Sequence, residues 1–182
     1  MSYVLVFAPL IGFLLTICFG KLLGDRISQI LTSSLVLVST LISFFYFFKF
    51  ISNDTAIIND RIINWLSSGK LNFDWSIYID PLTSLMLVII TSISFLVHVY
   101  SIEYMSHDKS KPRFMAYLSF FTFAMIMLVT ADNFVQLFFG WEGVGLASYL
   151  LIGFWYKKDS ANSAAMKAFV VNRVGDFGFL IG

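Results

Sequence analysis

The stretch Phe134–Tyr156, FVQLFFGWEGVGLASYLLIGFWY, decides the fold class of this chain. Its length and its almost wholly apolar composition are typical of a helix that crosses a lipid bilayer. One carboxylate, Glu142, nevertheless lies within it. A charged side chain in the hydrocarbon layer costs ~3 kcal/mol by insertion scales and is usually functional. We therefore expect Glu142 to take part in the chemistry of protons or ions.

Composition places the rest of the chain in lipid as well. Its mean hydropathy is +0.82, with 58% hydrophobic and 13% charged residues, far from the usage of soluble domains. A formal net charge of +1 excludes the clustered basic surface of a nucleic-acid-binding protein. The single cysteine, Cys18, cannot by itself build a disulfide, an iron–sulfur cluster or a thiolate metal site. We expect neither a metal nor a bound cofactor in this chain.

Apolar runs divide the sequence into membrane helices, because in lipid every backbone polar group must be satisfied within its own segment. The runs cover residues 3–23, 27–51, 81–104, 114–131, 134–156 and 164–182. They predict an all-α, polytopic transmembrane helix bundle that forms a single membrane domain over residues 1–182. The first run lacks a basic leader and a cleavage site, so we expect it to be retained. The last run ends at Gly182 without a cap, which suggests the N-terminal part of a longer protein.

The long connection over residues 52–80 carries a strand pattern. Apolar and polar residues alternate from Leu71 to Asp80, as in a half-buried strand. Residues 62–66 can supply an opposing strand and residues 67–70 a turn, which predicts a small hairpin. Pro81, directly after Asp80, is typical of the first turn of a helix.

Basic residues predict the orientation of the chain in the membrane. The first, third and fifth connections hold Lys21, Arg26, Lys109, Lys111, Arg113, Lys157 and Lys158. The much longer second connection holds only Lys49, Arg61 and Lys70, and the fourth holds none. By the positive-inside rule the first, third and fifth connections face the cytoplasm or the mitochondrial matrix. The N-terminus and the hairpin are then external.

A second group of charges lies in the last run, at Lys167, Arg173 and Asp176. With ~1.5 Å of rise per residue, Glu142 and Asp176 lie at nearly the same depth in a hydrocarbon core of about 30 Å. The short polar connection 157–160 makes their helices antiparallel neighbours. Two carboxylates about 6 Å apart repel each other by roughly 3 kcal/mol at an effective dielectric constant of 20, so at most one is comfortably ionised and a proton can be held there. The structural alternative is an ion pair between Asp176 and Arg173 on one helical face.

Other polar residues have weaker functional signals. Lys167, near the inner end of its helix, can extend to the interface. His98 and Glu103 lie near the inner end of the third run, where a histidine is more often structural than a relay. Gly145 and Tyr149 share a helical face with Glu142 and leave room for a water molecule.

Glycines in the same stretch favour packing over nucleotide binding. Gly140, Gly143 and Gly145 lack the spacing and the preceding strand of a phosphate loop. The small-xxx-small pairs, Gly143 with Ala147 and Gly178 with Gly182, favour close helix packing. The phenylalanine-rich fourth run is expected to carry no chemistry.

Two long segments resemble a known family. They are Phe139–Trp155, FGWEGVGLASYLLIGFW, and Ala164–Gly178, AAMKAFVVNRVGDFG, and His98–Met105, Arg113–Leu118 and Asp132–Phe134 fit the same pattern. Together they resemble the antiporter-like L-subunit family of respiratory complex I, the NADH:quinone oxidoreductase, called subunit 5 in mitochondria.

The resemblance implies proton-transfer roles for Glu142, Lys167, Arg173 and Asp176. The family's partner lysine on the seventh helix and its second half-channel lie beyond these residues. NADH, FMN, iron–sulfur clusters and quinone are expected in partner subunits and not in this chain. The implied partners are the other membrane-arm subunits and the lipid bilayer, in a bacterial plasma membrane or the mitochondrial inner membrane.

Two other functions remain open on the sequence. The large subunit of a multisubunit cation/proton antiporter shares the glutamate and lysine pattern. A non-transporting membrane scaffold, in which the charges only set helix register, predicts that Glu142→Gln leaves transport intact.

Overall fold

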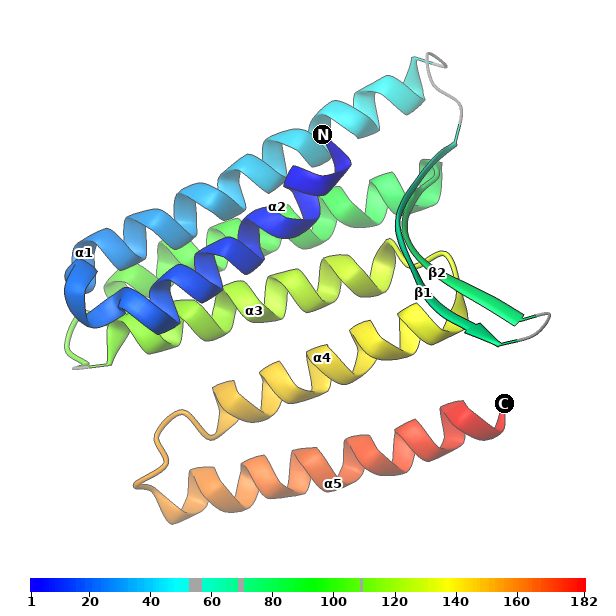
Figure 1. The fold of residues 1–182 in the computed structure, drawn as a ribbon. Helices are drawn as coiled ribbons and strands as arrows, with labels where there is room; N and C mark the ends of the chain where they lie inside the picture. Colours follow the sequence, from blue (N-terminus) through cyan, green and yellow to red (C-terminus); the bar gives the residue numbers. More distant parts are fainter. Residues whose placement is uncertain (53–56, 69–70, 109) are drawn as a thin grey trace.

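The computed structural model describes residues 1–52, 57–68, 71–108 and 110–182. Figure 1 shows a helical bundle with a two-stranded hairpin at one end. The elements in chain order are α1 (Ser2–Ile51), β1 (Ile58–Ser68), β2 (Leu71–Ile79), α2 (Pro81–Tyr104), α3 (Lys111–Val129), α4 (Phe134–Ile152) and α5 (Asp159–Ile181). This arrangement confirms the predicted all-α fold with a small hairpin.

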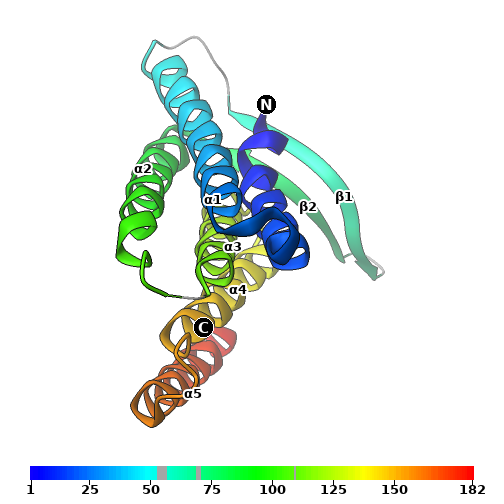
Figure 2. The ribbon, with the colours of Figure 1, turned by 90° about the vertical axis from the view of Figure 1, so that its left-hand side faces the viewer.

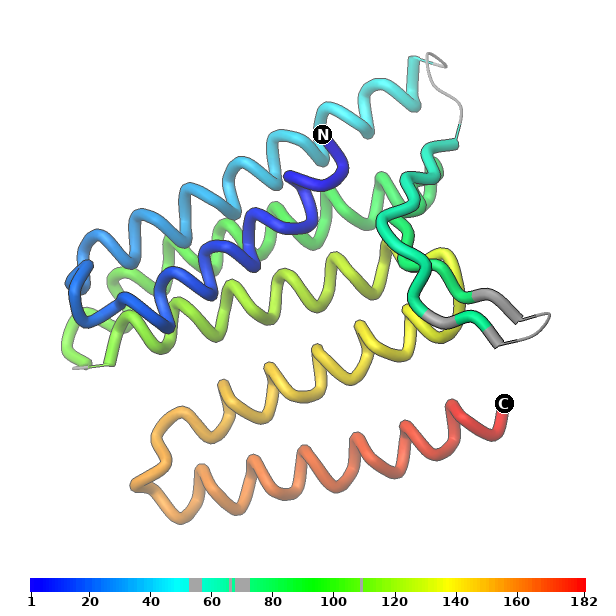
Figure 3. Tube along the Cα trace, viewed as in Figure 1, coloured from blue at the N-terminus to red at the C-terminus, as the bar shows by residue number. Residues whose placement is uncertain are grey.

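The first two predicted runs form two helical arms, together labelled α1, that meet at Gly24. The backbone of Gly24 is not helical, with φ 78° and ψ 170°. That conformation is essentially restricted to glycine, because a Cβ would clash with the backbone. The trace in Figure 3 shows the two arms of α1 running side by side in opposite directions. The bend therefore does the work of the predicted first connection.

Among the described residues, four helices, α1 to α4, are long and apolar enough to cross a membrane. α5 forms over the sixth predicted run but is not among these four. Its charged side chains, which include Lys167, Arg173 and Asp176, lower its hydropathy. The same residues that suggest a function thus make this helix the least apolar.

The hairpin is longer than the sequence predicts. β1 and β2 pair antiparallel from Ile58 opposite Ile79 to Ser68 opposite Leu71, with irregularities between Arg61 and Ile63 and between Asn64 and Leu66. The predicted first strand, 62–66, was too short, because ladder pairing continues across these bulges. Of the predicted turn, Ser67 and Ser68 belong to β1, and residues 69–70 lie outside the described residues.

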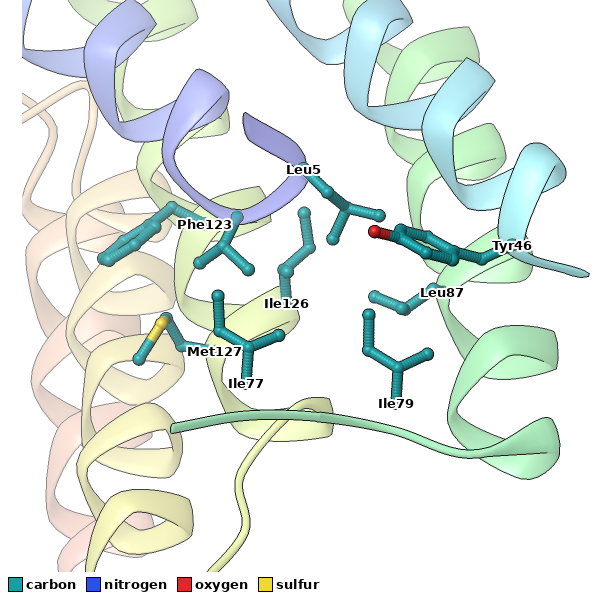
Figure 4. Packing of buried hydrophobic residues seen from close by; sticks show 9 residues of the cluster. Leu5, Tyr46, Ile77, Ile79, Leu87, Phe123, Ile126 and Met127 are labelled. Atoms are coloured by element: carbon teal, nitrogen blue, oxygen red, sulfur yellow. The ribbon is translucent and has the colours of Figure 1, made fainter. Parts of the chain in front are cut away.

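The hairpin closes one end of the bundle through its apolar face. Ile77 and Ile79 are fully buried, because alternation along β2 directs both toward the helices. Figure 4 shows them packed against the ends of the helices, in a cluster with Leu5, Val6, Tyr46, Leu87, Phe123, Ile126 and Met127. The Tyr78 amide also donates to the Thr130 carbonyl at 2.9 Å, which ties β2 to the end of α3.

The helices pack in a defined order. α1 packs on α2 and α3, α3 packs on α4, and α4 packs on α5. Figure 2 shows α4 and α5 extending from one side of the group formed by α1 to α3. The α3–α4 contact is close at Gly140, where an added Cβ would lie 2.6 Å from the Leu128 Cα.

The two predicted small-residue pairs behave differently. Gly143 faces Ala124 of α3, where an added Cβ would meet the alanine Cβ at 3.1 Å, and Ala147 is buried. Gly178 has no neighbour within 4 Å of an added Cβ in the described part of the chain. Only the α4 pair therefore serves helix packing here.

Candidate proton-transfer site between α4 and α5

The hairpin anchors the start of α4. The Asn133 side chain accepts a hydrogen bond from the Gln136 amide at 2.9 Å and donates to the Asp74 carbonyl at 2.8 Å. Gln136 is fully buried, and its side-chain amide exchanges two hydrogen bonds with the backbone of Ser76, at 3.1 and 2.7 Å. Capping and tertiary bonds therefore fix the depth at which Glu142, less than two turns further along, enters the bundle.

α4 and α5 run antiparallel, as the short connection predicts (Figure 1). Three contacts set their register. An added Cβ at Gly145 would lie 3.4 Å from the Asn172 side-chain nitrogen, the rings of Tyr149 and Phe169 meet at 5.6 Å, and Ala165 is buried beside Gly153. This register brings the charged residues of α5 to the level of Glu142.

Arg173 joins the two carboxylates. Its Nη1 lies 2.5 Å from Glu142 Oε1 and 3.4 Å from Asp176 Oδ2. The side chain of Asp176 is 9% exposed, that of Glu142 24% and that of Arg173 50%. An arginine joins the two carboxylates, and its contact with Asp176 is the ion pair that the sequence offered as the alternative to a direct approach of the carboxylates. Arg173 can do this because it lies one helical turn from Asp176 and its long side chain extends across to α4.

Two aromatic residues complete the cluster. The Trp141 indole N–H donates to Asp176 Oδ1 at 2.8 Å. The Arg173 guanidinium also lies over the Phe169 ring, 4.9 Å from its centre. Asp176 therefore accepts hydrogen bonds from a neutral donor and a cation at once.

The cluster lines a cavity of about 230 Å³ between α4 and α5. Its walls include Trp141, Glu142, Gly145, Asn172, Arg173 and Asp176. At ~30 Å³ per molecule this volume holds several waters, and the charged and amide side chains in its otherwise mostly apolar wall can serve as their partners. Glu142 and Arg173 also line a second, mostly apolar cavity of about 260 Å³ between α3 and α4. The ion pair therefore borders both spaces.

Other predicted site residues lie apart from this cluster. Lys167 is exposed, with no ion pair in the described ranges, and does not contact Glu142. Glu103 is exposed at the end of α2, and its side chain forms no ion pair or hydrogen bond with any described residue. Tyr149 lines a different cavity, of about 420 Å³, with Arg113 and Asn162.

His98 is buried inside the bundle, where the sequence predicts an interfacial position. Its exposed fraction is 0%, and it lies between α2 and α3. Nδ1 lies 2.8 Å from the Ser94 carbonyl oxygen and Nε2 lies 3.2 Å from Ser119 Oγ. The first contact requires Nδ1–H to donate, so Nε2 accepts from the serine in the neutral ring. Whether His98 is structural or a relay stays a prediction.

Sequence reasoning missed several polar neighbours. Ser119 and Thr122 belong to the fourth run, which was expected to carry no chemistry, yet Ser119 bonds His98 and Thr122 bonds Ser94. Trp141 and Asn172 line the cavity beside Glu142 and were also missed. The sequence could have indicated Ser119 and Thr122, because a polar residue in an apolar run is itself a signal. It could not have indicated the partners of Trp141, because they depend on helix register. Within the ranges that the structure describes, no group of three or more His, Cys, Asp or Glu could hold a metal ion.

Comparisons with known proteins identify the family to which this sequence is similar. The sequence model of the family described as "NADH-Ubiquinone oxidoreductase (complex I), chain 5 N-terminus" matches residues 65–115. The model described as "NADH:quinone oxidoreductase/Mrp antiporter, TM" matches residues 131–182, which include the whole cluster.

Curated relatives match along the entire chain. NADH-quinone oxidoreductase subunit L of Rhodobacter capsulatus is 50% identical over 189 residues, which cover 100% of this chain and 26% of the relative. Subunit L of Rickettsia bellii is 48% identical over 181 residues, 100% of this chain and 28% of the relative. NADH-ubiquinone oxidoreductase chain 5 of Arabidopsis thaliana is 50% identical over 182 residues, 100% of this chain and 27% of the relative. The chain thus spans about a quarter of the length of these relatives, and it belongs to the family of subunit L, or chain 5, of NADH:quinone oxidoreductase, respiratory complex I.

Proposed function

We propose that this chain is part of a proton-translocating membrane subunit of NADH:quinone oxidoreductase, and that Glu142, Arg173 and Asp176 form a proton-holding site in it. The observation that carries the proposal is the joining of two carboxylates by one guanidinium at the wall of a cavity between α4 and α5. Structural ion pairs in lipid are usually balanced, because an uncompensated charge is expensive there. Here two carboxylates share one guanidinium.

The charge balance explains how the site can hold a proton. Arginine stays charged at all relevant pH values, so the exchangeable proton must reside on a carboxylate. With both carboxylates ionised, the cluster carries one negative charge in excess. One proton from the cavity neutralises it, which a low-dielectric environment favours. Glu142 is the better acceptor, because Asp176 is also held by Trp141.

The energy by which a nearby charge affects this site is similar to the energy of moving one charge through the membrane potential. A unit charge that appears or disappears about 6 Å away changes the energy of the site by roughly 3 kcal/mol at an effective dielectric constant of 20. Moving one charge through a potential of 100 mV takes roughly 2.3 kcal/mol. A charge movement nearby is therefore sufficient to load or release a proton at this site. Electron transfer in other subunits would supply that charge movement.

Cofactors and partners follow from this function. The redox groups, namely NADH, FMN, iron–sulfur clusters and quinone, belong to partner subunits, and this chain binds none of them. Its partners are the other membrane-arm subunits and the bilayer, and nucleic acid is not among them. The site is located in a bacterial plasma membrane or the mitochondrial inner membrane, with the N-terminus outside. Lys167, exposed here, takes part in the same pathway outside the described cluster.

Neutralising the carboxylates tests the proposal. Glu142→Gln keeps the shape and a hydrogen-bonding amide but cannot exchange a proton. In the full-length subunit within the assembled complex, we expect NADH-driven proton uptake into inverted vesicles to fall on the order of tenfold or more. Asp176→Asn should reduce it less, because the Glu142 carboxyl is retained. The double variant should be non-additive, as expected for groups that share one proton.

The matched control is Asp159→Asn, which removes an exposed carboxylate from the first turn of the same helix. It should leave proton uptake and NADH oxidation at wild-type rates. Full uptake by Glu142→Gln, with normal assembly of the complex, would refute the proton-holding site and favour the scaffold function.

A cation/proton antiporter subunit is the second candidate, because the description of the family model over residues 131–182 also names Mrp antiporters. The two functions differ in their energy source. Proton movement that follows NADH oxidation supports the complex I subunit. Proton movement that follows an imposed sodium gradient without NADH would support the antiporter.

A further inference from the structure

A polar cavity of about 400 Å³ lies at the other end of the bundle, where α1 bends against the first turn of α3. Its walls include Thr16, Gly20, Lys21, Asp25, Ser110 and Arg113. Gly20 permits this contact, because an added Cβ would lie 3.0 Å from Pro112 Cβ. The cavity is remote in sequence from the α4–α5 cluster, and the proton-transfer proposal does not use it.

Two buried hydrogen-bond donors of this wall lack partners. Thr16 is 2% exposed, and its hydroxyl bonds no described residue. The hydroxyls of the other helical threonines with described bonds, Thr32, Thr40, Thr91, Thr122 and Thr130, all donate to the carbonyl four residues earlier. Arg113 Nε is likewise buried without a partner. Unpaired buried donors are rare in native structures and call for an acceptor.

Charge at the cavity favours an anion. Lys21 is exposed and forms no ion pair with any described residue. The one acidic wall residue, Asp25, is already paired with Lys111 at 3.5 Å. Arg113 donates through Nη2 to the Phe154 carbonyl at 3.1 Å, and its guanidinium lies over the Phe154 and Tyr156 rings, but it forms no ion pair within the described residues. The N-terminal end of α3, with its partial positive charge, adjoins the same space.

The depth of the cavity in the membrane indicates which kind of anion can occupy it. The α1 bend, the α2–α3 connection and the α4–α5 connection all lie at one end of the bundle (Figure 1). Trp155 and Tyr156, 41% and 58% exposed, belong to the α4–α5 connection, and such aromatic residues are enriched at the lipid headgroup level. Phospholipid phosphates occur at this depth, and basic pockets between membrane helices bind anionic lipids.

We propose that this cavity binds the phosphate of an anionic phospholipid. Lys21 and Arg113 face its negative charge, and the Thr16 hydroxyl donates to a phosphate oxygen. Ile17, which also lines the cavity, provides an apolar wall for the start of an acyl chain.

Photo-cross-linking in the assembled complex tests the site. The complex, with the full-length subunit, is reconstituted in phosphatidylcholine bilayers that contain a small fraction of photoactivatable phosphatidylglycerol. Cross-links are then mapped to peptides of α1 and α3. Lys21→Gln should lower their yield about five-fold, as expected for the loss of one basic residue at an anionic lipid. Thr16→Val, which removes only the unpaired hydroxyl, should lower it several-fold at unchanged shape.

The matched control is Arg26→Gln, a nearby exposed cation that does not line the cavity. It should leave the yield at the wild-type level. Equal losses in Arg26→Gln and Lys21→Gln would overturn the proposal, since they would show a diffuse basic surface. An unchanged yield in Thr16→Val would also overturn it, as would equal labelling by photoactivatable phosphatidylcholine. Displacement of the cross-link by millimolar inorganic phosphate would assign the cavity to a free anion and refute the lipid.

Discussion

At the residue scale, one guanidinium nitrogen contacts two carboxylates, and this determines what the α4–α5 site can do. Arginine stays charged, so any proton that the proposed site exchanges must reside on Glu142 or Asp176. The two acids are not equivalent. Asp176 is held from two sides, by Trp141 and Arg173, whereas Glu142 also borders the cavity between α3 and α4. We therefore infer that Glu142 exchanges the proton and Asp176 balances the charge.

The Trp141 hydrogen bond provides a test of this division of roles. Trp141→Phe removes the indole N–H donor to Asp176 but keeps an aromatic ring against Phe179. A hydrogen bond to a charged group contributes ~1.5–3 kcal/mol, so we expect proton uptake per NADH to fall several-fold. Trp155→Phe, whose indole N–H serves Asp108 in a connection, is the control and should pump normally. Equal uptake in both variants would show that Trp141 does not support the site.

Asp108, outside the membrane-spanning helices, gives a pH-dependent prediction. The Trp155 indole N–H, at 3.0 Å, and the Ser110 amide, at 2.7 Å, both donate to its carboxylate and lower its pKa. A lowered folded-state pKa stabilises this connection above the unfolded pKa of about 4. That stabilisation is lost as the pH falls through the folded pKa.

Hydrogen exchange measures this loss. After correction for the intrinsic rate, protection of the Ser110 amide should stay constant from pH 7 to 5 and decline below about pH 4. In Asp108→Asn the amide should be less protected at neutral pH and show no such decline. A wild-type decline centred near pH 6 would point to another titrating group.

At the element scale, the α3–α4 contact positions the site-bearing helix. An added Cβ at Gly140 would lie 2.6 Å from Leu128 Cα and 2.7 Å from its nitrogen, so the two backbones must separate to accommodate it. At Gly143 the added atom would meet only the Ala124 Cβ, at 3.1 Å. The two glycines lie on one helix face but differ in what they contact. Gly140 therefore sets the distance between α3 and α4.

This difference predicts a graded series. Gly140→Ala should destabilise the subunit by ~1–3 kcal/mol, the usual cost of overpacking, and Gly143→Ala clearly less. The measurement is the melting temperature of the assembled complex and its yield in membranes for each variant. Equal effects at the two positions would contradict the close α3–α4 approach at Gly140.

At the scale of the whole molecule, the basic residues are distributed unequally between the two ends of the bundle. Basic residues gather at the end formed by the α1 bend and the α2–α3 and α4–α5 connections (Figure 1), namely Lys21, Arg26, Lys111, Arg113, Lys157 and Lys158, and the predicted Lys109 lies outside the described residues. The hairpin closes the opposite end. The positive-inside rule therefore predicts that the basic end faces the cytoplasm or matrix and that the N-terminus is external.

Cysteine labelling tests this orientation in a Cys18→Ser background, since Cys18 is itself exposed. Ser67, on the hairpin, and His107, in the α2–α3 connection, are both exposed and suit single-cysteine variants. Ser67→Cys should react with an impermeant reagent from outside, and His107→Cys only from inside. The reverse pattern would place the N-terminus inside. Ser76, on the same hairpin, is unsuitable because it is buried against Gln136.

The sequence alone determined the fold class, the helix boundaries to within a few residues, the hairpin and the family. These properties depend on local patterns, since a 20-residue apolar run must be a helix in lipid and alternation defines a half-buried strand. It also singled out Glu142 and Asp176, because a carboxylate in an apolar run is conspicuous wherever its neighbours lie.

Only the tertiary structure decided which groups meet. The reach of Arg173 to Glu142, the Trp141 bond to Asp176 and the burial of His98 against Ser119 depend on the rotation and depth of packed helices. A few tens of degrees of helix rotation would separate these pairs without changing any sequence pattern. Helix packing at Gly140, the hairpin bonds to Gln136 and the bend at Gly24 set that rotation and depth, through contacts between residues far apart in the chain. For that physical reason the residues of the site were predictable one by one, and their arrangement was not.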